Sequence, residues 1–259
     1  MLFVSPSLTA LAPFARRTKA MPRPPVILGR QASLWVSAAV VTHTLWTSAA
    51  PAMAYRLYVE HWQLSHNVTA GIFAVYPIVV VAVLTLFGDL SDHIGRRAAM
   101  LLGLAASLAG ALCFALAPGV TWLFLGRALM GLGVGLSAGP STAAVLEFNG
   151  EAPAKRAAVI TAVAQSVGFA LALLLGGALT QYAPWPMRFS FWVLAAVITL
   201  LFAAAWFLPR SHGAAGGWRP RMPSVPTAVR RPFALAALAV VTAYNPWCHD
   251  PVARRADGA

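Results

Sequence analysis

The sequence is poor in charged residues, above all in acidic ones. Only 10% of its 259 residues are charged, and seven Asp and Glu stand against nineteen Lys and Arg, whereas 59% are hydrophobic. Soluble domains carry about 25% charged residues. So little charge cannot cover the surface of a soluble domain, and the composition predicts a protein that lipid surrounds.

Several missing patterns exclude other classes of protein. The two cysteines, Cys113 and Cys248, form neither a metal spacing nor a disulfide framework. No His-Glu-x-x-His occurs, which argues against an intramembrane enzyme. The net charge of +12 comes without a basic stripe interleaved with aromatic residues, so no nucleic-acid partner is expected. We expect no enzyme activity, no cofactor and no metal site.

Long apolar runs are what the sequence has instead. Helices need about 20 apolar residues to cross the hydrocarbon core, and backbone groups in lipid must be satisfied internally. The fold class predicted is therefore all-α, a polytopic membrane helix bundle. Its six spanning helices are predicted at 34–55, 68–87, 98–117, 122–146, 157–180 and 189–208.

The rest of the chain suggests a unit of half length. Residues 1–32 are expected to form an amino-terminal arm, 33–209 the six-helix domain, and the Pro- and Gly-rich residues 210–232 a linker. A seventh apolar run at 233–244 is too short to span a bilayer and is interpreted as a truncated helix, followed by a polar tail at 245–259.

Basic residues divide unevenly between alternate gaps. Cytoplasmic segments carry an excess of Lys and Arg, so the richer set of gaps is placed inside, with the amino terminus cytoplasmic. The outer gaps hold only Arg56 and Arg188. The inner segments hold Arg16, Arg17, Lys19, Arg23, Arg30, Arg96, Arg97, Lys155, Arg156, Arg210, Arg219, Arg221, Arg230 and Arg231.

A compact charged turn separates the second and third runs. It reads Gly88-x-Leu90-x-Asp92-x-x-Gly95-Arg96-Arg97, and it resembles the signature loop of the major facilitator superfamily, Gly-x-Leu-Ala-Asp-x-x-Gly-Arg-Lys/Arg. In the fourth run, Leu123-x-x-x-Arg127-x-x-x-Gly131-x-Gly133 is similar to a second motif of that family, with Met130 in place of the usual Gln. The resemblance covers residues from about 30 to 210 and implies the amino-terminal half of a twelve-helix secondary transporter.

Physical reasons support a role for the turn. Gly88 and Gly95 lack a Cβ and permit a tight reversal, while Asp92 is expected at the positive start of the third spanning helix, where Arg96 and Arg97 can pair with it, with Asp89 or with a neighbouring helix end. The resemblance implies a conformational latch that biases alternating access. The alternative is a charged turn that only marks the inner face.

Two titratable residues lie at membrane depth. Arg127 is expected to face the bundle interior, because a charge facing lipid costs at least about 2.5–3.5 kcal/mol, although snorkelling to the outer surface is the alternative. The family motif implies that it assists proton movement or orients an anionic group. His43 is the second candidate for proton coupling, and a hydrogen-bonded packing histidine is its alternative.

The remaining candidates are small or polar residues inside helices. Gly131, Gly133 and Gly135 imitate a dinucleotide-binding loop, but no strand precedes them and close helix packing explains them better. Polar residues inside helices usually face protein or a cavity, so five are candidates to line a substrate path. They are Thr47, Tyr76, Ser137, Gln165 and Ser166.

The resulting prediction is a secondary active transporter in the plasma (cell inner) membrane. It would move a small solute by alternating access, coupled to protons. The partners expected are the lipid bilayer, the solute and protons, with a homodimer if the half-length chain is active. The alternative is an inactive or partner-binding membrane fragment of a transporter. The fifth run lacks the Gly-Pro pair typical of drug:proton antiporters, so drug efflux is not specifically predicted.

Overall fold

The computed structural model describes residues 28–210, and its regular structure there is entirely helical. The seven helices are α1 Arg30–Trp62, α2 His66–Phe87, α3 Leu90–Ile94, α4 Arg96–Ala115, α5 Val120–Phe148, α6 Ala154–Tyr182 and α7 Phe189–Trp206. The all-α class and the six long helices are therefore confirmed. The expected amino-terminal arm, linker, short seventh run and polar tail lie largely or wholly outside the described residues.

The long helices differ in how apolar they are. Five of them, α2, α4, α5, α6 and α7, have the length and composition needed to cross a membrane. Helix α1 has 33 residues, long enough to span, but several of its buried side chains are polar, among them Ser37, His43 and Thr47. These polar residues lower the mean hydropathy of α1. They are tolerated in a membrane helix because α1 packs inside the bundle instead of facing lipid all round.

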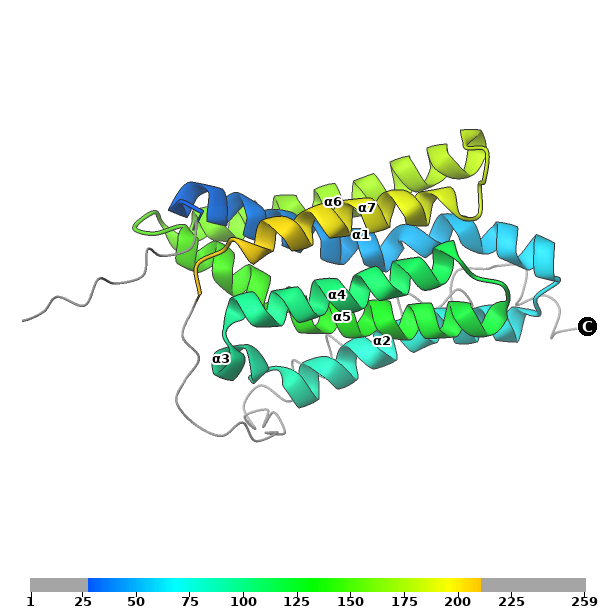
Figure 1. Ribbon diagram of the computed structural model, residues 1–259, viewed down its shortest axis with the longest axis horizontal. Helices are drawn as coiled ribbons and strands as arrows, with labels where there is room; N and C mark the ends of the chain where they lie inside the picture. Colours follow the sequence, from blue (N-terminus) through cyan, green and yellow to red (C-terminus); the bar gives the residue numbers. More distant parts are fainter. Residues whose placement is uncertain (1–27, 211–259) are drawn as a thin grey trace, which may run out of the picture.

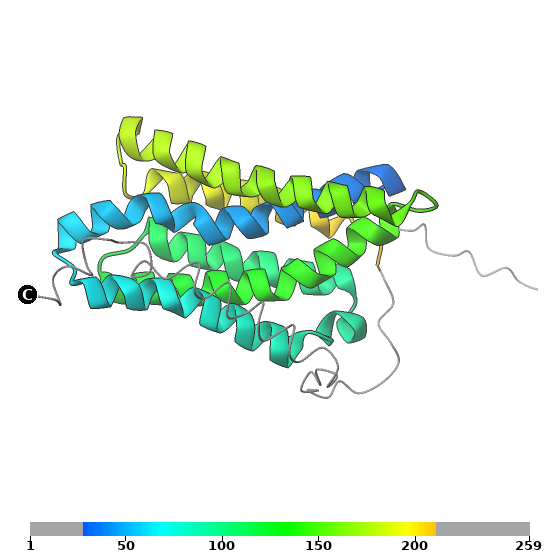
Figure 2. The same cartoon turned by 180° about the vertical axis from the view of Figure 1, so that it is seen from behind.

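Helix α5 lies at the centre of the bundle. It packs against α4, α1 and α2, while α1 also packs along α6 and α4 along α7. Figures 1 and 2 show α1, α6 and α7 grouped on one side and α2, α4 and α5 on the other, all running along the same long axis. Helices α2 and α6 are the least buried of the five membrane-length helices.

Glycines set the spacing around α5. Gly133 lies against Gly103 and Ser107 of α4, so closely that a Cβ there would overlap the Gly103 carbonyl oxygen. Gly131 and Gly135, one turn apart, instead face Val79 and Val83 of α2. Small residues let membrane helices approach to backbone contact, and here they bring helices against both sides of α5.

A similar close approach joins α1 and α6. The backbone of Gly168 lies on the carbonyl oxygen of Thr42, and a Cβ at this position would collide with it. Gly177, nine residues further along α6, has no atom within 4 Å of the place where its Cβ would be. The two helices therefore touch backbone to backbone at Gly168, whereas at Gly176 the nearest α1 atoms belong to the Met53 side chain.

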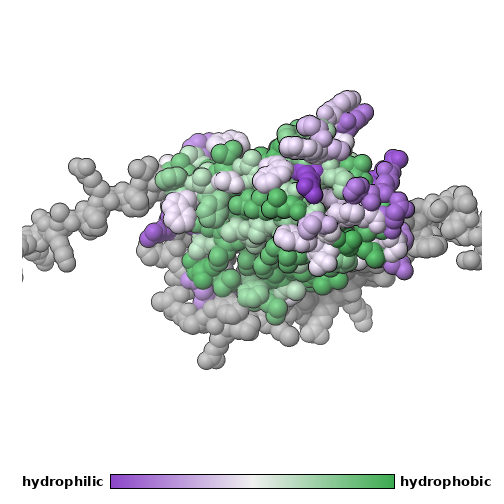
Figure 3. Space-filling model, turned by 45° about the vertical axis from the view of Figure 1, so that its right-hand side comes forward, coloured by the Kyte–Doolittle hydropathy of each residue, from purple (hydrophilic) through white to green (hydrophobic). Residues whose placement is uncertain are grey.

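The connections gather at the two ends of the bundle. Figure 1 shows α3 at the same end as the start of α1 and the finish of α7, and the α1–α2, α4–α5 and α6–α7 connections at the other end. This arrangement agrees with the alternation expected from the charged gaps. Figure 3 shows apolar side chains over the middle of one face and hydrophilic ones toward its ends, the pattern of a helical bundle in a membrane.

Candidate functional site

Arg127 lies inside the bundle, two turns from the start of α5. Its side chain is 1% exposed, and one guanidinium nitrogen donates a hydrogen bond to the Ser48 carbonyl of α1 at 3.2 Å. Three aromatic rings surround the guanidinium, with centroids 4.6 Å away for Tyr76, 5.5 Å for Phe73 and 5.9 Å for Tyr55. We call Arg127 with these three rings the Arg127 cage.

The cage holds a positive charge without a carboxylate. Among residues 28–210, no Asp or Glu lies within ion-pair distance of Arg127. The Arg127 Nε and the Tyr55 hydroxyl are buried without a hydrogen-bond partner. Aromatic faces stabilise a desolvated cation by about 2 kcal/mol or more, which helps to hold the charge at depth. The unsatisfied donors mark a place where a small polar or anionic group can bind.

His43 is a second buried polar group, on α1. It is 1% exposed, and neither ring nitrogen makes a hydrogen bond within the described residues. Thr47 lies one turn further along, fully buried, with its hydroxyl also unpartnered. His43 precedes Ser48 by five residues, about 7.5 Å along a helix. His43 and the Arg127 cage therefore occupy successive levels of the bundle.

The charged turn at the other end contains a short helix. Gly88 ends α2, Leu90 begins α3, and Gly95 adopts a φ of 88°, a left-handed backbone that favours glycine, just before α4. Asp92 lies in α3 and is exposed, so the expectation that it begins the third spanning helix is wrong. The inserted turn of helix moves it away from the start of α4.

The two arginines of the turn bind helix ends. Arg96 forms an ion pair with Glu147 in the last turn of α5. Arg97 donates a hydrogen bond to the Leu208 carbonyl at 3.2 Å and lies over the Trp206 ring, 5.5 Å from its centroid. Of the pairings expected from the sequence, the one with neighbouring helix ends is found, and no ion pair of Asp92 occurs within residues 28–210.

A family model and several relatives match this arrangement. The model described as Major Facilitator Superfamily matches residues 35–248. The chain belongs to the Major Facilitator Superfamily. Superfamily members are membrane transporters, so this chain is a multi-pass membrane protein of a transporter family.

Superfamily relatives extend well beyond the matched part. The Multidrug efflux pump LfrA of Mycolicibacterium smegmatis is 34% identical over 52% of this chain and 27% of its own length. The Lincomycin resistance protein of Streptomyces lincolnensis is 31% identical over 62% of this chain and 32% of its own. The chain thus spans about a third or less of these relatives.

Solved transporters share the fold. A peptide transporter POT in complex with sulfate superposes with a TM-score of 0.58 and 20% identity, over 81% of this chain and 44% of that one. A POT family transporter in complex with 5-aminolevulinic acid gives a TM-score of 0.57 and 19% identity, over 85% of this chain and 47% of that one. The six-helix unit corresponds to rather less than half of each.

Three of the polar residues expected along a substrate path either pack between helices or lie on the outer face of this six-helix unit. Ser137 is fully buried, donates to the Gly133 carbonyl at 2.8 Å and faces Gly103 of α4, so it packs between two helices. Gln165 and Ser166 lie on the exposed face of α6, where the Ser166 hydroxyl donates to the Ala162 carbonyl. These two do not face the interior of this six-helix unit. Thr47 and Tyr76 do lie among the helices.

Several residues of the site were not predicted from the sequence. Tyr55, Phe73 and Ser48 complete the surroundings of Arg127, and Glu147 pairs with the turn. The spacing of Phe73 and Tyr76, three residues apart, was the only local indication that two aromatic rings lie on one face of a helix. Their contact with Arg127, about fifty residues further along the chain, depends on helix packing that one sequence does not reveal.

Proposed function

We propose that this chain forms the amino-terminal half of a secondary active transporter that moves a small solute by alternating access, coupled to protons. The observation that carries the proposal is the Arg127 cage, a buried cation at membrane depth with no carboxylate partner among residues 28–210. Intramembrane charges are costly and mark ion or substrate pathways. The positive charge of the cage would attract an anionic group of the solute, or it would repel a proton toward a neighbouring proton-accepting side chain.

His43 and Thr47 are the proposed neighbours on the pathway. His43 lies about one and a half turns of α1 before Ser48, whose carbonyl binds Arg127, and Thr47 directly precedes Ser48; the polar side-chain atoms of both are unpartnered. A neutral histidine in this position can accept a proton when water or solute enters. The turn from Gly88 to Arg97 is proposed to act as the latch, with Arg96 and Arg97 holding the ends of α5 and α7.

A second six-helix unit is the proposed partner. Helices α2 and α6 are largely exposed, and α6 carries the polar Gln165 and Ser166 on its open face. Two such units enclose the solute site in secondary transporters with repeated halves. A second copy of this chain would satisfy the same need. The proposed location is the plasma membrane, with the Gly88–Arg97 turn in the cytoplasm.

Drug export is a second candidate for the direction and class of solute. It is favoured by two relatives whose names are Multidrug efflux pump LfrA and Lincomycin resistance protein. A membrane fragment that binds a partner without transport is the remaining alternative.

Liposome reconstitution separates these candidates. The purified chain is placed in liposomes with an internal pH dye, and a panel of amino acids, peptides, sugars and cationic drugs is added on one side. Solute-dependent proton movement that saturates and is lost in Arg127→Ala supports the proposal, and crosslinking then tests for a dimer. A chain that inserts but moves no proton with any solute, both alone and when reconstituted together with a second six-helix unit, supports the fragment alternative.

A further inference from the structure

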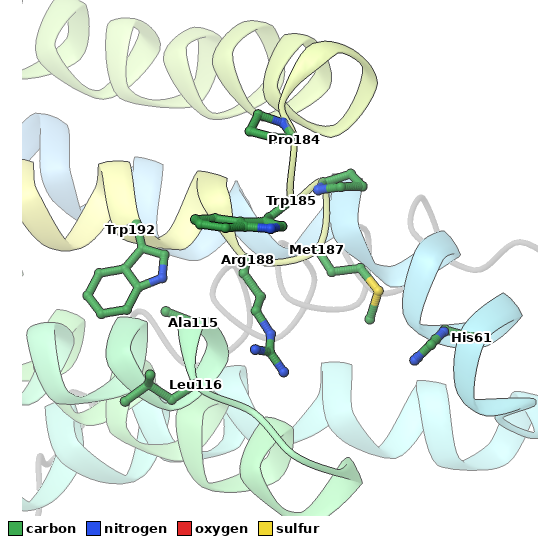
Figure 4. A pocket seen from close by; sticks show the side chains of 9 residues that line it. His61, Ala115, Leu116, Pro184, Trp185, Met187, Arg188 and Trp192 are labelled. Carbon is green, nitrogen blue, oxygen red and sulfur yellow. The ribbon is translucent and has the colours of Figure 1, made fainter.

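A pocket opens at the end of the bundle opposite the charged turn. It encloses about 460 Å³, within the range of small-ligand sites. Residues of four segments line it: the end of α1, the end of α4, the α6–α7 connection and the start of α7. Figure 4 shows the Arg188 side chain reaching into the space between Trp192 and His61, with Trp185 beside it.

The residues that line the pocket include one permanent cation and are otherwise largely apolar. Arg188 is its only permanently charged member, and no Asp or Glu is among the residues that line it. The Arg188 guanidinium makes one long hydrogen bond, 3.4 Å to the Ala117 carbonyl, which leaves most of its donors free for a ligand. The apolar part includes Leu116, Met187 and two tryptophans.

The tryptophans place the pocket at the membrane surface. Trp185 is 66% and Trp192 43% exposed, although both are large aromatic side chains. Exposed tryptophans at the ends of spanning helices lie at the level of lipid headgroups. Leu116, 52% exposed, provides apolar surface beside them. A ligand for this site therefore carries a negative group for Arg188 and a hydrocarbon part for the flanking surface.

We propose that this pocket binds the headgroup of an anionic phospholipid. The phosphate accepts hydrogen bonds from Arg188, since guanidinium forks match phosphate oxygens. The acyl chains lie along Trp192 and Leu116. The complementary charge and the position at the headgroup level favour this occupant over a dissolved anion. The site is separate from the Arg127 cage, and binding there does not depend on transport.

Native mass spectrometry of the delipidated, full-length chain tests the proposal. Phosphatidylglycerol, zwitterionic phosphatidylcholine and inorganic phosphate are titrated separately. We expect phosphatidylglycerol to bind at least fivefold more tightly than phosphatidylcholine, and Arg188→Gln to weaken it at least fivefold. Arg56→Gln is the matched control, because Arg56 lies outside the pocket on an exposed stretch of α1 and pairs with Glu60 at 2.9 Å. It should change the affinity less than twofold.

Trp185→Ala keeps the test decisive if Arg188→Gln does not fold, because the Trp185 side chain is largely exposed. It should weaken phosphatidylglycerol binding at least threefold. Equal affinity for the two lipids, or unchanged binding in the pocket variants, overturns the proposal. Displacement of the lipid by equimolar inorganic phosphate would show a dissolved-anion site and overturn it as well.

Discussion

The ion pair between Arg96 and Glu147 joins the first turn of α4 to the last turn of α5. The two residues lie 51 positions apart in the sequence. Both side chains are partly exposed, so the pair adds at most about 1 kcal/mol to stability. Its importance lies in position, because it attaches the turn with the family motif to the helix that carries Arg127.

Reversing this pair should be tolerated, while changing one partner should not. Arg96→Glu or Glu147→Arg alone places like charges together. In a chain without native cysteines, we expect a cysteine introduced at Ser91 to be labelled at least threefold faster in either single variant than in the parent. The double exchange should return the rate to within twofold of the parent. The matched control is the exchange of Arg56 and Glu60, an exposed pair at the far end of α1. Equal labelling of single and double variants would contradict a role for the ion pair.

The contact between α1 and α6 should be sensitive to one methyl group. Gly168→Ala places a Cβ on the Thr42 carbonyl oxygen, and overpacking of this kind costs about 1–3 kcal/mol. Gly177→Ala on the same helix meets no atom within 4 Å, and alanine is the better helix former by about 1 kcal/mol. Thermal unfolding in detergent should show a lower midpoint for the first variant and an unchanged or higher one for the second. Similar losses in both would argue against the close packing.

The helices themselves followed from the sequence, but their contacts did not. Apolar runs of spanning length predicted all six long helices, because lipid leaves the backbone no other choice. The short helix α3 was missed because its five residues read as a charged turn. The sequence also did not show that Ser137 faces α4, since polarity says that a residue avoids lipid but not which neighbour it faces.

The turn and the α1–α2 connection should lie on opposite sides of the membrane. With native cysteines replaced, a cysteine at Ser65 should react with an impermeant reagent in intact cells, and one at Ser91 should react only after the cells are opened. The reason is the uneven division of basic residues between the two ends. Labelling of the Ser91 variant in intact cells, without labelling of the Ser65 variant, would show that the chain has the opposite orientation in the membrane.

Arg127 and Asp92 should affect transport more than insertion. In a transport-competent assembly, Arg127→Ala removes the buried charge and Asp92→Asn removes the motif carboxylate of the proposed latch, and each should lower the transport rate more than tenfold at matched protein levels. Arg127→Lys retains a charge but not the planar group that stacks between rings, and should recover only part of the rate. Tyr76→Phe keeps the ring over Arg127 and should be milder than Arg127→Ala. Wild-type rates in both charge variants would reject these roles.

The glycines on two sides of α5 have a mechanical consequence. Because backbone contacts fix α5 to α2 on one side and to α4 on the other, the three helices should tilt as one stiff lever instead of sliding past each other. Arg127 lies just before these glycines on α5, whereas Glu147 lies beyond Pro140, which is inside the same helix. We expect a ligand that shifts the guanidinium to move α2 and α4 together with this part of α5, so that occupancy inside the bundle is transmitted to three helices at once.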